Sequence, residues 1–97
     1  MRYEIIIAPE AVHDLKRLRA STRATVKDAM ETHLRHEPTK LSRSRIKRLR
    51  GLAQPQFRLR VDDVRVFYDV VENRVEVLAV VAKADAARWL AKVGRES

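Results

Sequence analysis

The chain contains no cysteine, only two glycines and three prolines, and few aromatic residues among its 97 positions. Without cysteine it can form no disulfide, no zinc–thiolate site and no thiol nucleophile. The three histidines lack the H-x-x-x-H and HExxH spacings of metal sites, so we expect no metal and no cofactor. A hydrophobic content of 45% with so little glycine and proline excludes a disordered chain and predicts a single domain over residues 1–97.

Long hydrophobic runs are also missing from the sequence. The start, MRYEIIIAPEA, has only a few apolar residues before Pro9 and Glu10. Such a run is too short for the hydrophobic region of a signal peptide or for a membrane span. We therefore expect a cytoplasmic protein with no membrane partner, and we interpret this run as a β-strand.

Acidic residues are absent from the middle of the chain, where the positive charge is concentrated. The formal net charge is +8, and the segment from residue 40 to 60 carries eight basic residues and no acid, so the remainder is neutral. A charge gathered in one segment is typical of proteins that bind a polyanion, either nucleic acid or an acidic protein. A solvated loop that aids solubility is the alternative. The basic residues of the segment are Lys40, Arg43, Arg45, Lys47, Arg48, Arg50, Arg58 and Arg60.

Hydrophobic periodicity predicts an α+β domain. Apolar residues recur at helical spacing near the N-terminus and alternate with polar residues after residue 56. The predicted order is an N-terminal strand, a two-helix hairpin, an antiparallel three-strand meander and a short C-terminal helix, with the helices on one face of a mostly antiparallel sheet. The expected strands cover 2–8, 56–61, 64–70 and 74–82, and the expected helices cover 9–20, about 21–37 and about 84–94.

The meander places three arginines on one face. If residues 62–63 form a two-residue loop, Arg60 pairs with Arg65, and Arg58 shares their face. Like charges directly opposite each other destabilise a sheet by a few tenths to about 1 kcal/mol. A phosphate would relieve this repulsion, and the planar guanidinium can engage two phosphate oxygens.

Two other residues share the arginine side of the meander. Phe67 there is either a ring that stacks on a base or a core residue covered by a helix or by the basic segment. Asp69 is expected to form one surface salt bridge with an arginine, which would leave the others unpaired.

Three segments of the chain carry a resemblance to a known family: KRLRGL at 47–52, FRLRVDDVRVFYDV at 57–70 and VEVLAVVAK at 75–83. Together with the element order, they resemble the RelE/ParE superfamily of toxins from type II toxin–antitoxin modules. In the RelE branch the toxin enters the ribosomal A site and cleaves mRNA, whereas the ParE branch poisons DNA gyrase. In both branches the resemblance implies an antitoxin that wraps a segment around the toxin and often displaces or covers its C-terminal helix.

The resemblance also implies roles for individual residues. Arg58, Arg60 and Arg65 fall on or beside basic positions that RelE-like toxins use to hold and activate the scissile phosphate, and Lys83 falls on a basic position at the end of the last strand. The resemblance therefore implies catalytic roles for these four residues. Ala84 and Leu90 stand where those toxins commonly carry an arginine and a tyrosine. The segment residues Lys40, Arg43, Arg45, Lys47, Arg48 and Arg50 are expected to bind RNA or the ribosome, and Trp89, Leu90 and Val93 are expected to bind the antitoxin.

The absence of this arginine and this tyrosine affects the expected chemistry. Attack of a 2′-hydroxyl on a phosphate needs a base, an acid and charge stabilisation, and arginine supplies only the last because it stays protonated. The proton transfers must then come from Lys83, another lysine, a ribosomal group or an unidentified residue. For His13, His33 and His36 we expect surface or packing roles.

The leading hypothesis is a toxin that inhibits translation by ribosome-dependent mRNA binding and cleavage, with the ribosome, mRNA and a cognate antitoxin as partners. One alternative is a ParE-like inhibitor of DNA gyrase without nuclease activity. Another is a degenerate toxin retained as an antitoxin-binding module.

Overall fold

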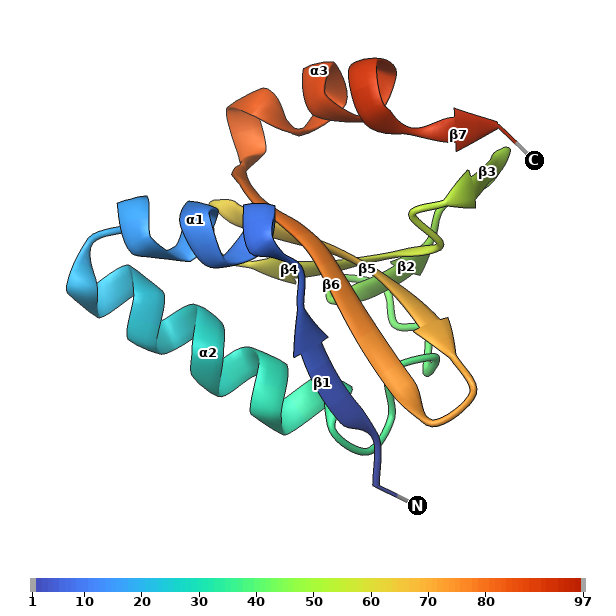
Figure 1. Ribbon diagram of the computed structural model, residues 1–97, viewed down its shortest axis with the longest axis horizontal. Coiled ribbons are helices and arrows are strands. Elements are labelled where there is room, and N and C mark those ends of the chain that lie inside the picture. The colour runs from blue at the N-terminus through green and yellow to red at the C-terminus, as the bar shows by residue number, and fades with distance from the viewer. Residues whose placement is uncertain (1, 97) are drawn as a thin grey trace.

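The computed structural model describes residues 2–96, and it confirms the predicted α+β order while adding three short strands (Figure 1). Each predicted helix and each strand of the meander is present near its expected position. The elements are β1 (Glu4–Ile7), α1 (Pro9–Arg17), α2 (Ala20–Leu34), β2 (Ile46–Arg48), β3 (Leu52–Gln54), β4 (Phe57–Val61), β5 (Val64–Val71), β6 (Arg74–Ala82), α3 (Lys83–Val93) and β7 (Arg95–Glu96).

Five of these strands form one mixed sheet in the order β1-β6-β5-β4-β2. β1 runs parallel to β6, and the other neighbours are antiparallel. In the β4–β5 hairpin Arg60 lies opposite Arg65 and Val61 opposite Val64, which confirms the two-residue loop at 62–63. Asp62 in that loop has φ of 51°, a conformation that hairpin turns of this length require. β3 and β7 form a separate two-stranded pair.

The helices lie on both faces of the sheet, so the prediction of helices on one face is wrong for α3. Figure 1 shows α2 and α3 on opposite sides of the strands. The physical reason is the alternation along β5, which directs Phe67 away from the core that α1 and α2 cover. A phenylalanine on that face needs its own apolar cover, and Trp89 of α3 supplies it.

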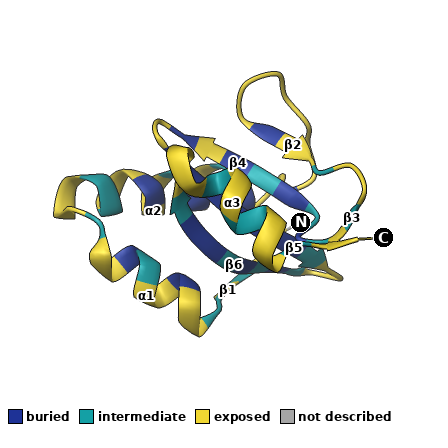
Figure 2. Cartoon of the chain, turned by 90° about the horizontal axis from the view of Figure 1, so that it is seen from above, coloured by how far each residue is buried: buried dark blue, intermediate teal, exposed yellow. Residues whose placement is uncertain are grey.

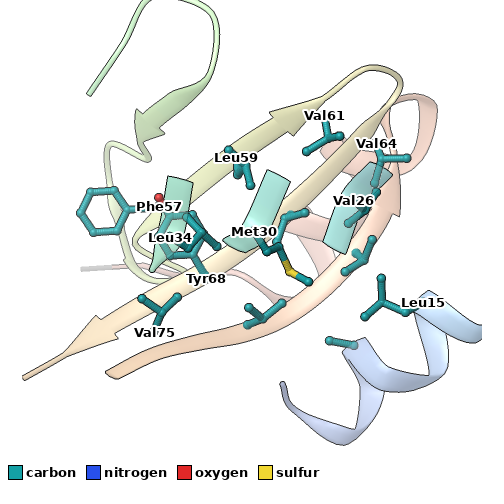
Figure 3. Packing of buried hydrophobic residues seen from close by; sticks show 14 of the residues in the cluster. Leu15, Val26, Met30, Leu34, Phe57, Leu59, Val61, Val64, Tyr68 and Val75 are labelled. Atoms are coloured by element: carbon teal, nitrogen blue, oxygen red, sulfur yellow. The ribbon is translucent and has the colours of Figure 1, made fainter. Parts of the chain in front are cut away.

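The main core lies between the helical hairpin and the sheet. Val26, Met30 and Leu34 follow one another at i, i+4 and i+8, so they form one buried stripe along α2. Figure 3 shows this stripe over Leu59 and Tyr68 of the hairpin. In Figure 2 the strands β5 and β6 are largely buried, whereas the outer turns of α1 and α2 are exposed.

One buried hydrogen bond holds the start of the basic segment against the core. The hydroxyl of Tyr68, a fully buried residue, donates to the carbonyl oxygen of Pro38 at 2.6 Å. Burial raises the pKa of Tyr68, so the phenol stays protonated and keeps donating. Further on, the Ser42 Oγ accepts bonds from the backbone amides of Arg45 and Ile46, both at 3.0 Å, and turns the chain into β2. The basic segment is thus anchored at both of these points.

We predict that Tyr68→Phe lowers the free energy of unfolding by about 1–2 kcal/mol, because a buried carbonyl would lose its partner. Urea denaturation followed by circular dichroism measures this change. Tyr3→Phe, which removes the hydroxyl of a half-buried tyrosine, is the matched control and should change stability less. Equal effects of the two substitutions would show that the Tyr68 to Pro38 bond does not anchor the segment.

Candidate functional site

Four basic side chains meet on the face of the sheet that looks away from the main core. The register places Lys47 of β2 opposite Arg58 of β4, and Arg60 opposite Arg65 of β5. These two cross-strand pairs contain no acid, and all four side chains fall on one face by strand alternation. We call this set, Lys47, Arg58, Arg60 and Arg65, the arginine face. It confirms the shared face that the sequence predicts for the three arginines and adds Lys47.

Arg58 is the member of the arginine face whose charge is partly buried without a complete set of partners. Its side chain is half-buried, and among residues 2–96 its Nε atom is buried without a hydrogen-bond partner. Burial first, and then the positive charges of Arg65 and Arg60, lower the pKa of Arg58. An incompletely paired cation is expensive to bury. An anion placed here would supply both the missing hydrogen-bond acceptor and the missing negative charge.

Arg65 is held differently, because it is buried and directed back toward the hairpin loop. Its Nη1 donates to the carbonyl oxygens of Asp62 at 2.8 Å and Val64 at 3.1 Å. These bonds fix the guanidinium beneath the loop and occupy part of its donor set. Arg60, its cross-strand partner, is exposed. Within the hairpin, Arg60 is therefore the arginine most open to a partner, while Arg65 contributes a fixed charge.

Asp69 does not pair with an arginine, so the expected surface salt bridge is wrong. The carboxylate is buried and accepts bonds from Gln54 Nε2 and from the backbone amide of Gln56, both at 2.8 Å. Gln56 Oε1 in turn accepts from the amide of Val70 at 3.0 Å. This network ties the segment before β4 to the end of β5, and the arginine face keeps its charge.

Phe67 is covered, in agreement with the core interpretation of this residue. Its ring is fully buried and stacks on Trp89 of α3, with centroids 4.9 Å apart and an interplanar angle of 11°. An offset or parallel contact of this kind stabilises the docking of α3 beyond the area it buries. In this conformation the ring of Phe67 is closed to a nucleotide base.

Lys83 is exposed and lies at the first position of α3, beside the hairpin loop. Its backbone amide donates to the carbonyl oxygen of Asp63 at 2.7 Å. The register brings it to the same end of the sheet as the Arg60 to Arg65 pair, because Ala82 lies opposite Val64. The structure thus brings Arg60, Arg65 and Lys83 to the loop end of the hairpin, whereas Arg58 lies farther along β4, opposite Phe67.

The remaining basic residues of the segment have separate positions. Lys40 forms an exposed ion pair with Glu37 at 3.4 Å. The guanidinium of Arg48 lies 5.1 Å from the centroid of the Phe57 ring, on the core side of the sheet. Arg43, Arg45 and Arg50 are exposed. Of the six residues expected to bind RNA or the ribosome, only Lys47 joins the arginine face.

Of the three residues expected to bind an antitoxin, Trp89 and Val93 line an apolar groove beside α3, and Leu90 does not. Trp89 and Leu90 are half-buried, and Val93 is 45% exposed. A groove of about 410 Å³ runs between α3, the start of α1 and the residues before β4. Its apolar lining is formed by Ala8, Pro9, Pro55, Leu78, Trp89 and Val93.

Within residues 2–96 there is no group of three or more histidine, aspartate or glutamate side chains arranged to hold a metal ion. In the same part of the chain, no helix has the length and apolar character needed to cross a membrane.

The burial of Arg58 leads to a prediction about stability. Arg58→Met keeps the length of the side chain and removes its charge, so we expect the free energy of unfolding to rise by roughly 0.5–2 kcal/mol. Arg50→Met, in an exposed loop, is the control and should stay within about 0.5 kcal/mol of the parent. Urea denaturation in low-salt buffer without multivalent anions is the measurement. A loss of stability in Arg58→Met would contradict an unrelieved cation at this position.

The comparisons with known proteins fit this architecture. The family model of the ParE toxin of the type II toxin–antitoxin system parDE matches residues 5–87. A comparison with curated protein sequences finds no significant match.

Several solved structures share the fold. The RelBE2 toxin–antitoxin complex of Mycobacterium tuberculosis is 24% identical, with a TM-score of 0.70 over 84% of this chain and 99% of that one. The RelE–RelB complex of Pyrococcus horikoshii is 22% identical, with a TM-score of 0.70 over 86% and 97%. A mutant of Escherichia coli RelE in the free state is 22% identical, with a TM-score of 0.69 over 94% and 93%. The family match, extending over most of the chain, and the shared fold establish that this protein belongs to the ParE toxin family, within the RelE/ParE superfamily of type II toxin–antitoxin toxins.

Proposed function

We propose that this toxin inhibits translation by binding RNA at the ribosome through the arginine face, in the manner of RelE. The observation that carries the proposal is Arg58, whose buried Nε has no partner and whose neighbours Arg60 and Arg65 are also positive. Such an arrangement costs folding free energy unless an anion completes it. A backbone phosphate supplies charge and acceptor oxygens together.

The same residues define the chemistry that we propose. In cleavage by a 2′-hydroxyl, Arg58 and Arg60 would stabilise the charge that develops on the phosphorane, and the fixed guanidinium of Arg65 would add to the field. None of the three can accept a proton. Lys83, exposed beside the hairpin loop, is the proposed proton carrier on this chain. Cleavage would then depend on the ribosome to supply the remaining proton transfer.

An antitoxin is the second proposed partner. Toxins of the same fold from Mycobacterium tuberculosis and Pyrococcus horikoshii have been crystallised with their antitoxins. On this chain the apolar groove lined by Trp89 and Val93, with Leu90 on the same helix, is the surface that we propose for an apolar antitoxin segment. Burial of half-exposed apolar side chains would supply the driving force.

Inhibition of DNA gyrase without chemistry is the second candidate function. Two observations favour it: the family model is that of the ParE toxin, and the ring of Phe67, which shares the face of the arginines, lies under Trp89 in the described structure. Ala84 and Leu90 also stand where RelE-like toxins commonly carry an arginine and a tyrosine, so one charge-stabilising group and one proton-transfer group are missing. A binder would need none of these groups.

Inducible expression separates the two functions. We predict that incorporation of labelled methionine falls early after induction, before plasmid supercoiling changes. An early loss of supercoiling while translation continues would overturn the proposal in favour of gyrase.

The arginine face can be tested in the same cells. The double variant Arg58→Met with Arg60→Gln should lose growth inhibition while it keeps the circular dichroism spectrum of the parent. Arg50→Gln is the control, and we expect it to stay toxic. A folded double variant with full toxicity would contradict the proposed role of the arginine face.

A further inference from the structure

A second stripe of α2 lies beside the core stripe and faces a hollow. Thr25, Ala29 and His33 follow one another at i, i+4 and i+8, each one position before Val26, Met30 or Leu34 of the core. Their side chains are small or polar, and the methyl group of Ala29 in the middle leaves space between the helix and the sheet edge. The stripe therefore does not close over its neighbours as the core stripe does.

The opposite wall of this hollow forms because two strands end at different points. β2 begins at Ile46, opposite Leu59, whereas β4 continues to Val61, so its last two residues have no strand beside them on the side away from β5. The backbone amide of Arg60 donates to the carbonyl oxygen of Arg45 at 2.8 Å, and the chain then turns away at Ser42. The result is a hollow of about 410 Å³, which we call the α2 hollow. Its lining includes Thr25, Ala29, His33, Ser44, Arg45 and Arg60.

The charges around the α2 hollow favour an anion. Arg45 and Arg60 contribute two positive charges, and Asp62 at the rim contributes one negative charge. A second, smaller hollow is also lined by His33, and its charged lining residues are Glu37, Lys40 and Arg45. Glu37 and Lys40 pair with each other and largely cancel. The charged groups that face His33 thus leave a net positive field.

His33 responds to this field. Its side chain is half-buried, and burial first, then the positive charge of Arg45, lower the pKa of the imidazole. A neutral imidazole has one N–H donor and one acceptor nitrogen. A bound anion would oppose the effect of Arg45, so it would raise the pKa of His33 and draw a proton onto the ring.

We infer that the α2 hollow binds a backbone phosphate of single-stranded RNA, held by the guanidinium of Arg45 and by hydrogen bonds from His33 and Ser44, with Arg60 at the sheet edge adding positive charge. The inference rests on the proposed action on RNA and extends it, because Arg60 belongs to the arginine face and also lines the α2 hollow. The α2 hollow and the arginine face would then bind two phosphates of the same RNA strand near the end of β4. Guanidinium and hydroxyl groups are the usual partners of phosphate oxygens in such contacts.

The test uses the full-length toxin and hexauridylate as the probe. We expect the ring resonances of His33 to move toward the protonated form as hexauridylate is added at pH 7, because binding raises the pKa of the imidazole. Arg45→Gln should weaken the affinity for hexauridylate by roughly tenfold, the effect of losing one charge-assisted hydrogen bond. It should also reduce the slope of log K against log salt by about 0.7, the value for one phosphate contact on a single strand.

Lys27→Gln is the matched control for charge. Lys27 is exposed on the same helix and lines neither hollow, so its loss should weaken binding less than about twofold through long-range screening alone. Equal losses in Arg45→Gln and Lys27→Gln would overturn the inference.

The other outcomes are equally decisive. If hexauridylate does not bind, or binds without moving the His33 resonances, the α2 hollow is not a phosphate site. If hexauridylate binds without moving the His33 resonances but shifts the Arg58 Nε resonance, the RNA binds at the arginine face, and the proposed function still holds without the α2 hollow. If hexaglutamate binds as tightly as hexauridylate and moves the same resonances, the hollow recognises an acidic peptide, and the inference of an RNA site is wrong.

Discussion

The two-residue loop at 62–63 fixes the register of β4 against β5, and the side chains of both faces follow from that register. On one face it stacks Phe57 on Tyr68, with centroids 5.5 Å apart, beneath the buried stripe of α2. On the other face it sets Arg60 against Arg65. A shift by one residue would place arginines in the core, so the buried face enforces the like-charge pair on the opposite face. The packing of the core and the grouping of the arginines on the other face therefore both follow from the register of β4 against β5.

The face opposite the main core is divided between stability and binding. Its β5–β6 end is closed, because Trp89 covers Phe67 and anchors α3. Its β4–β2 end keeps an unpaired guanidinium nitrogen on Arg58 and an exposed Arg60. Proteins that hold a destabilising group at one place offset it elsewhere, and functional sites are where such groups concentrate. The buried Asp69 network belongs to the stabilising side, since it fixes the approach to β4 without neutralising the arginines.

Periodicity in the sequence predicts the helical hairpin, the meander and the shared face of the three arginines, because both patterns extend over several residues. Four features escape it. β2 has only three residues, of which Ile46 alone is apolar, so it carries no alternation to detect. The side of the sheet on which α3 lies depends on Phe67 and Trp89, which are distant in the sequence. Asp69 meets Gln54 and Gln56 only after the strands have paired, and the α2 hollow beside His33 depends on where β2 begins.

The central claim is that the arginine face holds a cation whose partner is an anion from outside the chain. Its most direct test compares the free energy of unfolding in sulfate and in chloride at equal ionic strength, for the parent and for Arg58→Met. A ligand that binds only the folded state stabilises it in proportion to the logarithm of its concentration above the dissociation constant. The account predicts a larger gain from sulfate in the parent than in the variant. Equal gains in the two proteins would contradict it.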